Sequence, residues 1–355
     1  MLPCSSTSSS EGGAVASTTA ISVERTSNFV NPKHHRRWLF SLIGLIIAAI
    51  GLTIATIVYG NPMPFGSEGF WKIAESRVVS VVVIAVVALA HSFATVAFHT
   101  VTANRIVTPS ILGFEALYGL INTAAVFFMG AIGATLTRGI VSYFFQVVVM
   151  VAFATLLYTW LLGSKFTNVH TMLLVGVVMG AGLASLTTFM QRMLDPNEFD
   201  ILTARLMGNI SNASTEYLPY AVPIVVIVGI WLWLNSRRLD TLSLGSAVST
   251  NLGLTHRTEL IKVLIAVSIL MAMTTSLVGP MTFLGFLVAT MAYSIADTYS
   301  HKAVFPLAFL LGYVLLTGAY FVLRHIFYAQ GAVTIIVELI GGLVFLIVIM
   351  RKGRL

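Results

Sequence analysis

The chain has 355 residues, of which 57% are hydrophobic and only 9% are charged, and its formal net charge at pH 7 is +7. Soluble domains carry about 25% charged residues, so this composition excludes an ordinary soluble domain and indicates an integral membrane protein. The single cysteine, Cys4, excludes a disulfide framework and a metal cluster held by several thiolates.

The N-terminal residues 1–37 are predicted to form a disordered cytoplasmic tail. Ser, Thr, Gly and Ala dominate its first part without apolar periodicity. A basic cluster at 33–37 then precedes the first apolar run, 38–59, which is long enough to cross a bilayer. A cleaved signal peptide has a shorter apolar region, so this run is expected to stay in the membrane with its basic flank in the cytoplasm.

Ten membrane-spanning helices are predicted within a transmembrane domain at residues 38–350. The apolar runs are continuous rather than alternating, and most have about the 17–25 residues that a helix needs to cross a bilayer. Backbone polar groups must find partners within the lipid, so the expected fold class is an all-α polytopic membrane protein. The expected spans are 38–59, 78–100, 112–133, 140–162, 170–190, 217–236, 259–278, 281–295, 303–323 and 332–350.

The distribution of basic residues supports this topology. With the N-terminus in the cytoplasm, 14 of the 20 Lys and Arg residues fall on the cytoplasmic side. Cytoplasmic loops of multi-pass proteins carry such an excess. The even number of spans also places the C-terminal tail, 351–355, in the cytoplasm. The positive net charge therefore needs no nucleic-acid partner.

A polar insert at 237–257 interrupts the apolar runs and carries basic residues at both of its ends. Its small residues at 242–247 and 251–254 predict two short helices separated by a glycine turn. We interpret the insert as a docking surface on the cytoplasmic side. The alternative interpretation is a solvated connector between two spans.

Three short motifs occur in order on the predicted spans. Residues 103–113 read Ala-Asn-Arg-Ile-Val-Thr-Pro-Ser-Ile-Leu-Gly, residues 278–285 read Val-Gly-Pro-Met-Thr-Phe-Leu-Gly, and residues 339–342 read Leu-Ile-Gly-Gly. Together they resemble the FecCD-type permeases, the membrane subunits of ABC importers for iron-siderophores, haem and cobalamin. Arg105 replaces a proline of the family. The first motif is most similar to the branch whose permeases pair with a second, different permease to import catecholate-type siderophores.

The resemblance implies the fold of a type II ABC importer permease and a set of partners. These are a dimer of ABC ATPases, a second permease subunit (a different chain or otherwise an identical copy) and an extracellular substrate-binding lipoprotein that delivers a ferric siderophore. No Gly-x-x-x-x-Gly-Lys-Ser/Thr phosphate loop occurs in the chain. ATP and Mg²⁺ are therefore expected on the separate ATPase. This chain is expected to bind no cofactor and to be a transport subunit rather than an enzyme.

The resemblance also assigns candidate residues for coupling to the ATPase. Leu244, Gly245, Leu252 and Gly253 match positions of the short coupling helices that sit in a cleft of the ATPase in the family. Glycines at such a contact allow close backbone approach. The alternative is that these residues serve packing alone.

Further candidates lie at the two ends of the predicted pore. Asn104 and Ile106 match positions that line the cytoplasmic gate, where a polar residue beside a branched apolar one closes a pore by packing and dewetting. The alternative for Asn104 is a loop-capping role. Arg77 and Arg324 match outer arginines that pair with glutamates of the binding protein, and arginine suits such bidentate contacts. Their alternative role is that of arginines at helix ends whose heads reach the interface.

Two acidic residues lie inside predicted spans, where a carboxylate costs about 2.5–3.5 kcal/mol on insertion scales. Glu338 lies on the last span, which lines the pore in the family, and is the candidate pore residue; helix capping or pairing across a subunit interface is the alternative. Glu115 is expected to form hydrogen bonds with nearby backbone. A secondary carrier driven by an ion or proton gradient, with Glu115 and Glu338 as coupling sites, is the alternative function, but no internal repeat supports it.

An intramembrane enzyme is the third function considered. It would need paired acids, a Ser/His dyad or a metal pair within the spans, and no such arrangement stands out. The histidines form no His-x-x-x-His pair. We therefore predict neither catalytic residues nor a metal site.

Overall fold

The computed structural model describes residues 32–137, 139–163, 169–210, 213, 215–327 and 333–352. The predicted N-terminal tail up to residue 31 and the end of the chain after residue 352 lie outside the described residues. All regular secondary structure in the described part of the chain is helical. The helices are α1 (Pro32–Val58), α2 (Glu68–Thr102), η1 (a 3-10 helix, Pro109–Leu112), α3 (Phe114–Leu136), α4 (Ile140–Gly163), α5 (Val169–Gln191), α6 (Pro196–Leu206), α7 (Leu218–Leu234), α8 (Ser236–Leu242), α9 (Ser246–Asn251), α10 (His256–Val278), α11 (Leu284–Ala296), α12 (His301–His325) and α13 (Val333–Lys352).

Each of the ten predicted spans coincides with an apolar helix. Among the residues that the structure describes, six helices, α1, α2, α4, α5, α10 and α12, are long and apolar enough to cross a membrane. The pair α7 and α8, bent by 59° at its break, makes a seventh candidate, and α3, α11 and α13 contain shorter apolar stretches of 10–17 residues. The chain is therefore a multi-pass membrane protein, and the prediction of an all-α fold is confirmed.

The first helix begins earlier than predicted. α1 starts at Pro32, whereas the first span was expected from residue 38. Proline is favoured in the first turn of a helix, because the missing N–H would have no partner there. Residues 33–37 therefore extend α1 by more than a turn instead of belonging to an unstructured tail.

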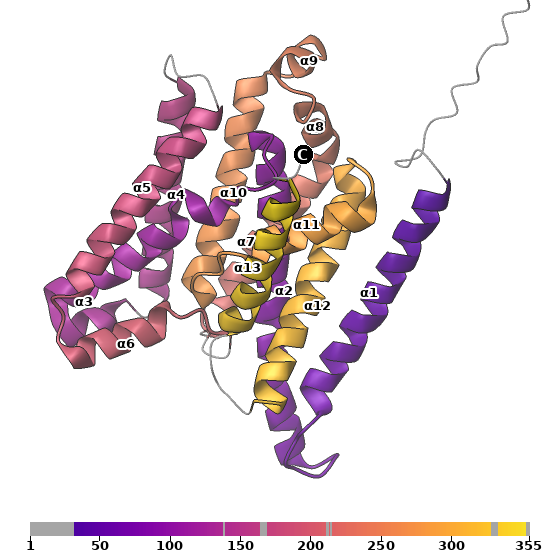
Figure 1. The fold of residues 1–355 in the computed structure, drawn as a ribbon. Helices are drawn as coiled ribbons and strands as arrows, with labels where there is room; N and C mark the ends of the chain where they lie inside the picture. The colour runs from indigo at the N-terminus through magenta and orange to yellow at the C-terminus, as the bar shows by residue number, and fades with distance from the viewer. Residues whose placement is uncertain are drawn as a thin grey trace, which may run out of the picture.

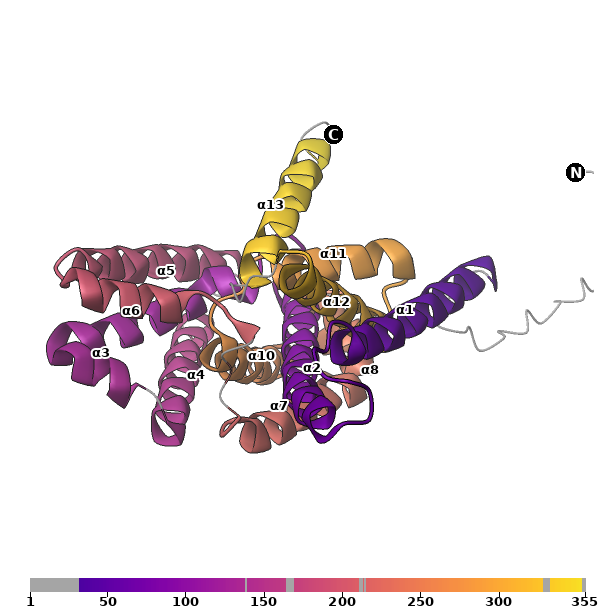
Figure 2. The same cartoon turned by 90° about the horizontal axis from the view of Figure 1, so that it is seen from below.

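α2 and α10 form the centre of the bundle. In the most apolar 18-residue stretch of each helix, 78% of the residues are buried in α2 and 72% in α10. The corresponding shares are 33% in α4 and 28% in α5. Figure 2 shows α2 and α10 between a group containing α3 to α6 and a group containing α1, α11 and α12. A helix that is apolar on all sides belongs in such a core. The outer helices expose large apolar side chains on the outside of the bundle, among them Val148, Leu156, Leu174, Val178 and Phe189.

Glycines allow η1 to pack directly onto α5. A Cβ atom added to Gly180 would lie 3.1 Å from the Cα atom of Gly113, and one added to Gly176 would lie 2.6 Å from Cδ2 of Leu112. Small residues at such crossings let membrane helices approach closely. The motif at 103–113 therefore ends in a tight helix contact.

The insert at 237–257 lies at one end of the bundle, uppermost in Figure 1, which we call the insert end. The described part of α1 begins and that of α13 ends toward this end. The connection between α1 and α2 and the helix α6 lie at the opposite end, which we call the far end. This arrangement places the candidate coupling and gate residues at one end and the candidate docking residues at the other.

Candidate functional site

The insert contains two short helices, α8 and α9, joined by a turn at Gly245. Gly245 has φ +89°, and Gly253, which turns the chain after α9, has φ +84°. Left-handed backbone of this kind favours glycine, because a Cβ atom would crowd the following carbonyl. The prediction of two short helices separated by a glycine turn is confirmed. The small-residue segments at 242–247 and 251–254 contribute mainly to the turns, and the helices begin before them.

Three large apolar side chains of the insert are exposed, one in the turn between α8 and α9, one in α9 and one directly after it. Leu244 is 57% exposed, Val248 45% and Leu252 63%. Val248 in α9 and Leu252 directly after it are four residues apart and lie on the same side of that helix, whereas Leu244 lies in the turn before Gly245. We call these three exposed residues the apolar edge. A Cβ atom added to Gly245 or Gly253 would meet no heavy atom within 4 Å, which shows that the surface beside the edge is open. Sequence reasoning missed Val248, although its spacing of four residues from Leu252 was a usable signal.

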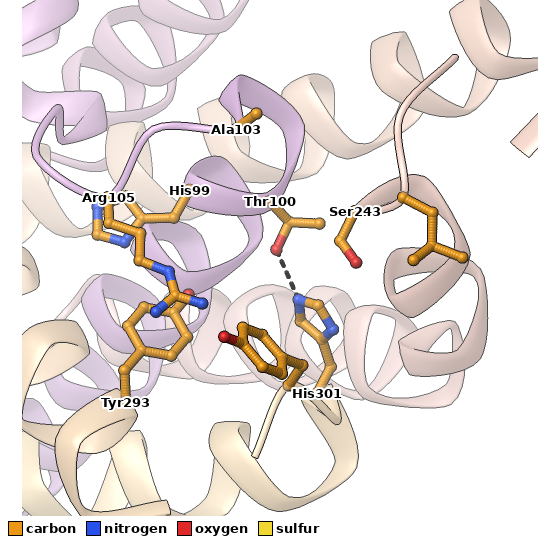
Figure 3. A pocket seen from close by; sticks show the side chains of 9 residues that line it. His99, Thr100, Ala103, Arg105, Ser243, Tyr293 and His301 are labelled. Carbon is orange, nitrogen blue, oxygen red and sulfur yellow. Dashed lines mark hydrogen bonds between the residues drawn. The ribbon is translucent and has the colours of Figure 1, made fainter. Parts of the chain in front are cut away.

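A chain of hydrogen bonds ties the insert to two long helices. Oδ1 of Asp240 in α8 accepts a hydrogen bond from the backbone N–H of His301 at 2.9 Å and lies 2.5 Å from Nδ1 of the same residue. Nε2 of His301 lies 2.6 Å from Oγ1 of Thr100 in α2, a contact drawn in Figure 3. His301 is the first residue of α12, and its side chain is 6% exposed. The Asp240–His301–Thr100 chain, which the sequence did not indicate, therefore joins α8, α12 and α2.

Polar contacts also fix the insert to α10. Oε1 of Glu259 lies 2.9 Å from Nζ of Lys262 and 3.4 Å from a guanidinium nitrogen of Arg238 in α8. Oγ of Ser249 in α9 lies 2.7 Å from Nδ1 of His256. Glu259 is 8% exposed, so its pairs are screened less than surface pairs, which contribute little. The insert is thus held by α2, α10 and α12 together.

A cavity of about 490 Å³ lies beside the insert, and Figure 3 shows the side chains that line it. The lining comes from the end of α2, the end of α11, the start of α12 and the turn between α8 and α9. The guanidinium carbon of Arg105 lies 4.4 Å from the ring centre of Tyr293 and 5.3 Å from that of Tyr299. Cation–π contacts at these distances hold the charge in place. Arg105 therefore occupies the cavity as a positioned charge.

The candidate gate residues lie in the turn between α2 and η1. Oδ1 of Asn104 accepts a hydrogen bond from the backbone N–H of Ile106 at 2.9 Å, and Ala103 before it has φ +48°. Asn104 and Ile106 are both half-buried. The Asn104 side chain caps its own turn, which is the alternative role given above. The gate role of the two residues stays a prediction.

Arg77 has a different role from the one expected. Its side chain is buried, with 3% exposure, and its guanidinium donates hydrogen bonds to the backbone oxygens of Thr56, Ile57, Tyr59 and Gly60. These carbonyls lie at the C-terminal end of α1, where a helix leaves its last carbonyl groups without partners. The prediction that Arg77 docks an extracellular protein is therefore wrong, because the buried guanidinium donates its hydrogen bonds to the carbonyl groups at the end of α1.

Arg324 remains exposed at the far end. One of its terminal guanidinium nitrogens donates to the hydroxyl of Tyr320 at 2.7 Å, and its guanidinium carbon lies 5.9 Å from the Tyr320 ring centre. Arginine has five N–H donors, so this anchored side chain keeps donors for a partner. Its docking role stays a prediction.

We expect replacement of Arg77 with Met to lower the unfolding temperature of the purified protein by about 5 °C or more. The reason is that a hydrogen bond to a charged group contributes about 1.5–3 kcal/mol, and Arg77 supplies the donors for several carbonyls of α1. Thermal unfolding in detergent measures the effect. The matched control, Arg324→Met, removes a single hydrogen bond of an exposed arginine and should shift the temperature much less; equal shifts would contradict the capping role.

The two membrane carboxylates approach the same segment, between α10 and α11. Glu115, near the start of α3, accepts hydrogen bonds from the backbone N–H of Met281 at 3.2 Å and from Oγ1 of Thr282 at 2.5 Å. Glu338 of α13 is half-buried and approaches the backbone of Thr282. Glu115 therefore bonds to backbone as expected, although that backbone lies 166 residues further along the chain. The pore role of Glu338 stays a prediction.

Comparison with known proteins gives relatives that match most of the chain. The chain is 45% identical over 329 residues to the petrobactin import system permease protein FatC of Bacillus anthracis, and the match covers 93% of each protein. It is 32% identical over 314 residues to the petrobactin import system permease protein YclO of Bacillus subtilis, with 88% of this chain and 96% of the relative covered. The ferric enterobactin transport system permease protein FepD of Escherichia coli is 28% identical over 258 residues, or 72% of this chain and 75% of the relative.

A solved structure shows the same fold. It is an inward-facing conformation of a metal-chelate type ABC transporter, with a TM-score of 0.75 over 87% of this chain and 98% of that chain. The identity is 18%, so the likeness concerns the fold alone, and it confirms the predicted fold of an ABC importer permease. The match to the FecCD transport family covers residues 37–351, nearly all of the bundle. With this match and the two petrobactin permeases above 30% identity, the chain belongs to the FecCD transport family.

Proposed function

We propose that this chain is the permease subunit of a binding-protein-dependent ABC importer that carries a ferric siderophore across the cytoplasmic membrane. The observation that carries the proposal is the apolar edge, Leu244, Val248 and Leu252, exposed on a polar insert at one end of a membrane bundle. Exposed apolar side chains grouped on an otherwise polar segment mark a protein interaction site. The names of FatC and YclO support a siderophore as the cargo.

The proposal places the insert end in the cytoplasm, where an ATPase dimer binds to the apolar edge. The basic residues at 33–37 and within the insert lie at this end, in agreement with the positive-inside rule. Both termini are then cytoplasmic. Because the chain contains no phosphate loop, ATP and Mg²⁺ bind to the ATPase.

A second permease subunit, either a different chain or an identical copy, completes the pore. α13 projects from the bundle in Figure 2 and carries the half-buried Glu338. A carboxylate at membrane depth faces protein or a water-filled path rather than lipid, which supports a partner subunit or a pore at this side of α13. Glu338 is the residue of this chain that we assign to the pore.

Transport follows from motion at the insert. A substrate-binding lipoprotein loaded with ferric siderophore docks at the far end, where Arg324 pairs with one of its carboxylates. Closure of the ATPase dimer then displaces the apolar edge. The Asp240–His301–Thr100 chain passes this displacement to α12 and α2, and the gate turn with Asn104 and Ile106 follows directly after α2. The gate opens because its turn moves with the helix that carries it.

We expect Arg324→Glu to weaken docking of the binding protein by tenfold or more, because it replaces an attraction between opposite charges with repulsion at the same contact. Binding of the purified, loaded binding protein to the permease complex in nanodiscs measures the effect. Lys72→Glu is the matched control, since it reverses another exposed charge at the far end. If both variants bind as the wild type does, Arg324 has no docking role.

The proposed function is tested by reconstituting the complete transporter into proteoliposomes and measuring uptake of radiolabelled ferric petrobactin. We expect uptake that requires ATP on the ATPase side and is not driven by an imposed proton or sodium gradient. Uptake of radiolabelled ferric enterobactin, measured in parallel, shows which of the two siderophores the transporter carries. Uptake that is driven by an ion gradient and needs no ATP would show that the chain is a secondary carrier and not a subunit of an ABC importer. ATP-driven transport of neither chelate would overturn the siderophore assignment.

A further inference from the structure

The cavity beside the insert holds a positive charge that no acidic side chain neutralises within the described part of the chain. Arg105 is exposed and forms no ion pair there within 4.0 Å. Two aspartates lie on the elements around the cavity, but each already has a histidine partner: Asp240 contacts His301 at 2.5 Å, and Asp297 contacts His34 at 2.6 Å. The cavity therefore presents the uncompensated charge of Arg105.

The geometry around Arg105 suits an oxygen anion. Its guanidinium lies against the ring of Tyr293, as Figure 3 shows, and its guanidinium carbon is 5.3 Å from the ring centre of Tyr299. A guanidinium stacked on an aromatic ring keeps the N–H donors in its own plane free for the two oxygens of a carboxylate or phosphate. The site around Arg105 can therefore take an oxyanion that the described part of the chain does not supply.

The position of the cavity identifies the source of this anion. Leu244 belongs both to the lining of the cavity and to the apolar edge. A protein that covers Leu244 therefore also covers the cavity, and a volume of about 490 Å³ holds a whole side chain. We propose that an acidic side chain of the ATPase subunit enters this cavity and pairs with Arg105. This inference rests on the proposed function, in which the ATPase covers the apolar edge.

The test measures the affinity of the purified ATPase subunit for the assembled permease in nanodiscs. Loss of a hydrogen-bonded charge pair in Arg105→Gln is expected to weaken the affinity about tenfold or more. Arg105→Lys keeps the positive charge but cannot form two parallel hydrogen bonds to a carboxylate. Its affinity for the ATPase should therefore lie between those of the wild type and Arg105→Gln. Arg37→Gln is the matched control, because it removes an exposed arginine from the insert end without touching the cavity. The difference in ATPase affinity between the wild type and Arg105→Gln should become smaller as the salt concentration is raised, because salt screens the charge pair.

Equal affinity of the wild type and Arg105→Gln, with both proteins equally resistant to thermal unfolding, overturns the inference. Stabilisation of the permease alone by inorganic phosphate, lost in Arg105→Gln while ATPase affinity is unchanged, would reassign the cavity to a free anion. Leu252→Asp separates this inference from the proposed function, because Leu252 belongs to the apolar edge but does not line the cavity. If Leu252→Asp leaves ATPase binding intact, the ATPase does not bind at the apolar edge and the proposed function is wrong there. If Leu252→Asp abolishes binding and Arg105→Gln does not weaken it, only the present inference fails.

Discussion

Aspartates in place of Leu244 and Leu252 are expected to abolish ferric-siderophore uptake, although the protein still reaches the membrane in normal amount. Both side chains are more than half exposed in the free chain, so their replacement removes little packing from the bundle. At an interface, truncation of a central apolar residue costs about 2 kcal/mol or more. Two such losses correspond to roughly a thousandfold weaker ATPase affinity. Uptake is measured in cells that lack this chain and are complemented with either form.

The matched control carries the same two charges on the other face of α9. Ser246 and Thr250 are exposed and lie two residues to either side of Val248, about 200° around the helix. The variant Ser246→Asp with Thr250→Asp should therefore transport nearly as well as the wild type. If both double variants lose transport equally, the insert responds to charge alone and the apolar edge has no special role. If both transport normally, the insert is the solvated connector that the sequence also allowed.

Replacement of Asp240 with Ala is expected to leave ATPase binding nearly unchanged but to reduce transport per ATP hydrolysed about tenfold. Asp240 accepts both the backbone N–H and the ring contact of His301, and a buried donor left without a partner costs about 1–3 kcal/mol. We expect this cost to be relieved by loosening of α8 from α12, because the apolar edge itself is untouched. The ratio of siderophore transported to ATP consumed in proteoliposomes measures the coupling directly.

Two further variants make the coupling result specific. Asp240→Asn keeps an acceptor oxygen without the charge and should retain intermediate coupling. Asp297→Asn disrupts the other Asp–His pair at the insert end, whose side chains are 43% and 54% exposed, and it should have little effect because exposed pairs contribute little. Asparagine also tolerates the left-handed backbone of Asp297, which has φ +46°. Normal coupling in Asp240→Ala would show that α8 moves α12 by packing alone.

The membrane-spanning segments were predictable because the lipid bilayer places a requirement on each stretch of sequence separately. A continuous apolar run of sufficient length must form a helix there, so all ten segments could be found without knowledge of their neighbours. The glycine turn of the insert was also predictable, because Gly245 and Gly253 adopt a backbone that other residues avoid. The leucines of the insert were found through the family resemblance, and their exposure agrees with that assignment.

The contacts between distant segments were not predictable in the same way. The family resemblance suggested that Arg77 is available to a binding protein, but its guanidinium bonds to the carbonyl groups at the end of α1, which need donors. Asp240 and His301 are separated by 61 residues, and neither residue is unusual within its own segment. Their pairing depends on how α8 meets α12.

The sequence by itself therefore determined the fold class, the family, the number of apolar segments and the position of the insert. Each of these depends on local composition or on a short motif. Only the tertiary structure decided which polar groups meet: Arg77 with α1, Asp240 with His301, and Arg105 with its two tyrosines. The physical reason is that a hydrogen bond or a cation–π contact depends on distance and direction in space, and a bundle of helices brings together residues whose separation along the chain carries no trace of that contact.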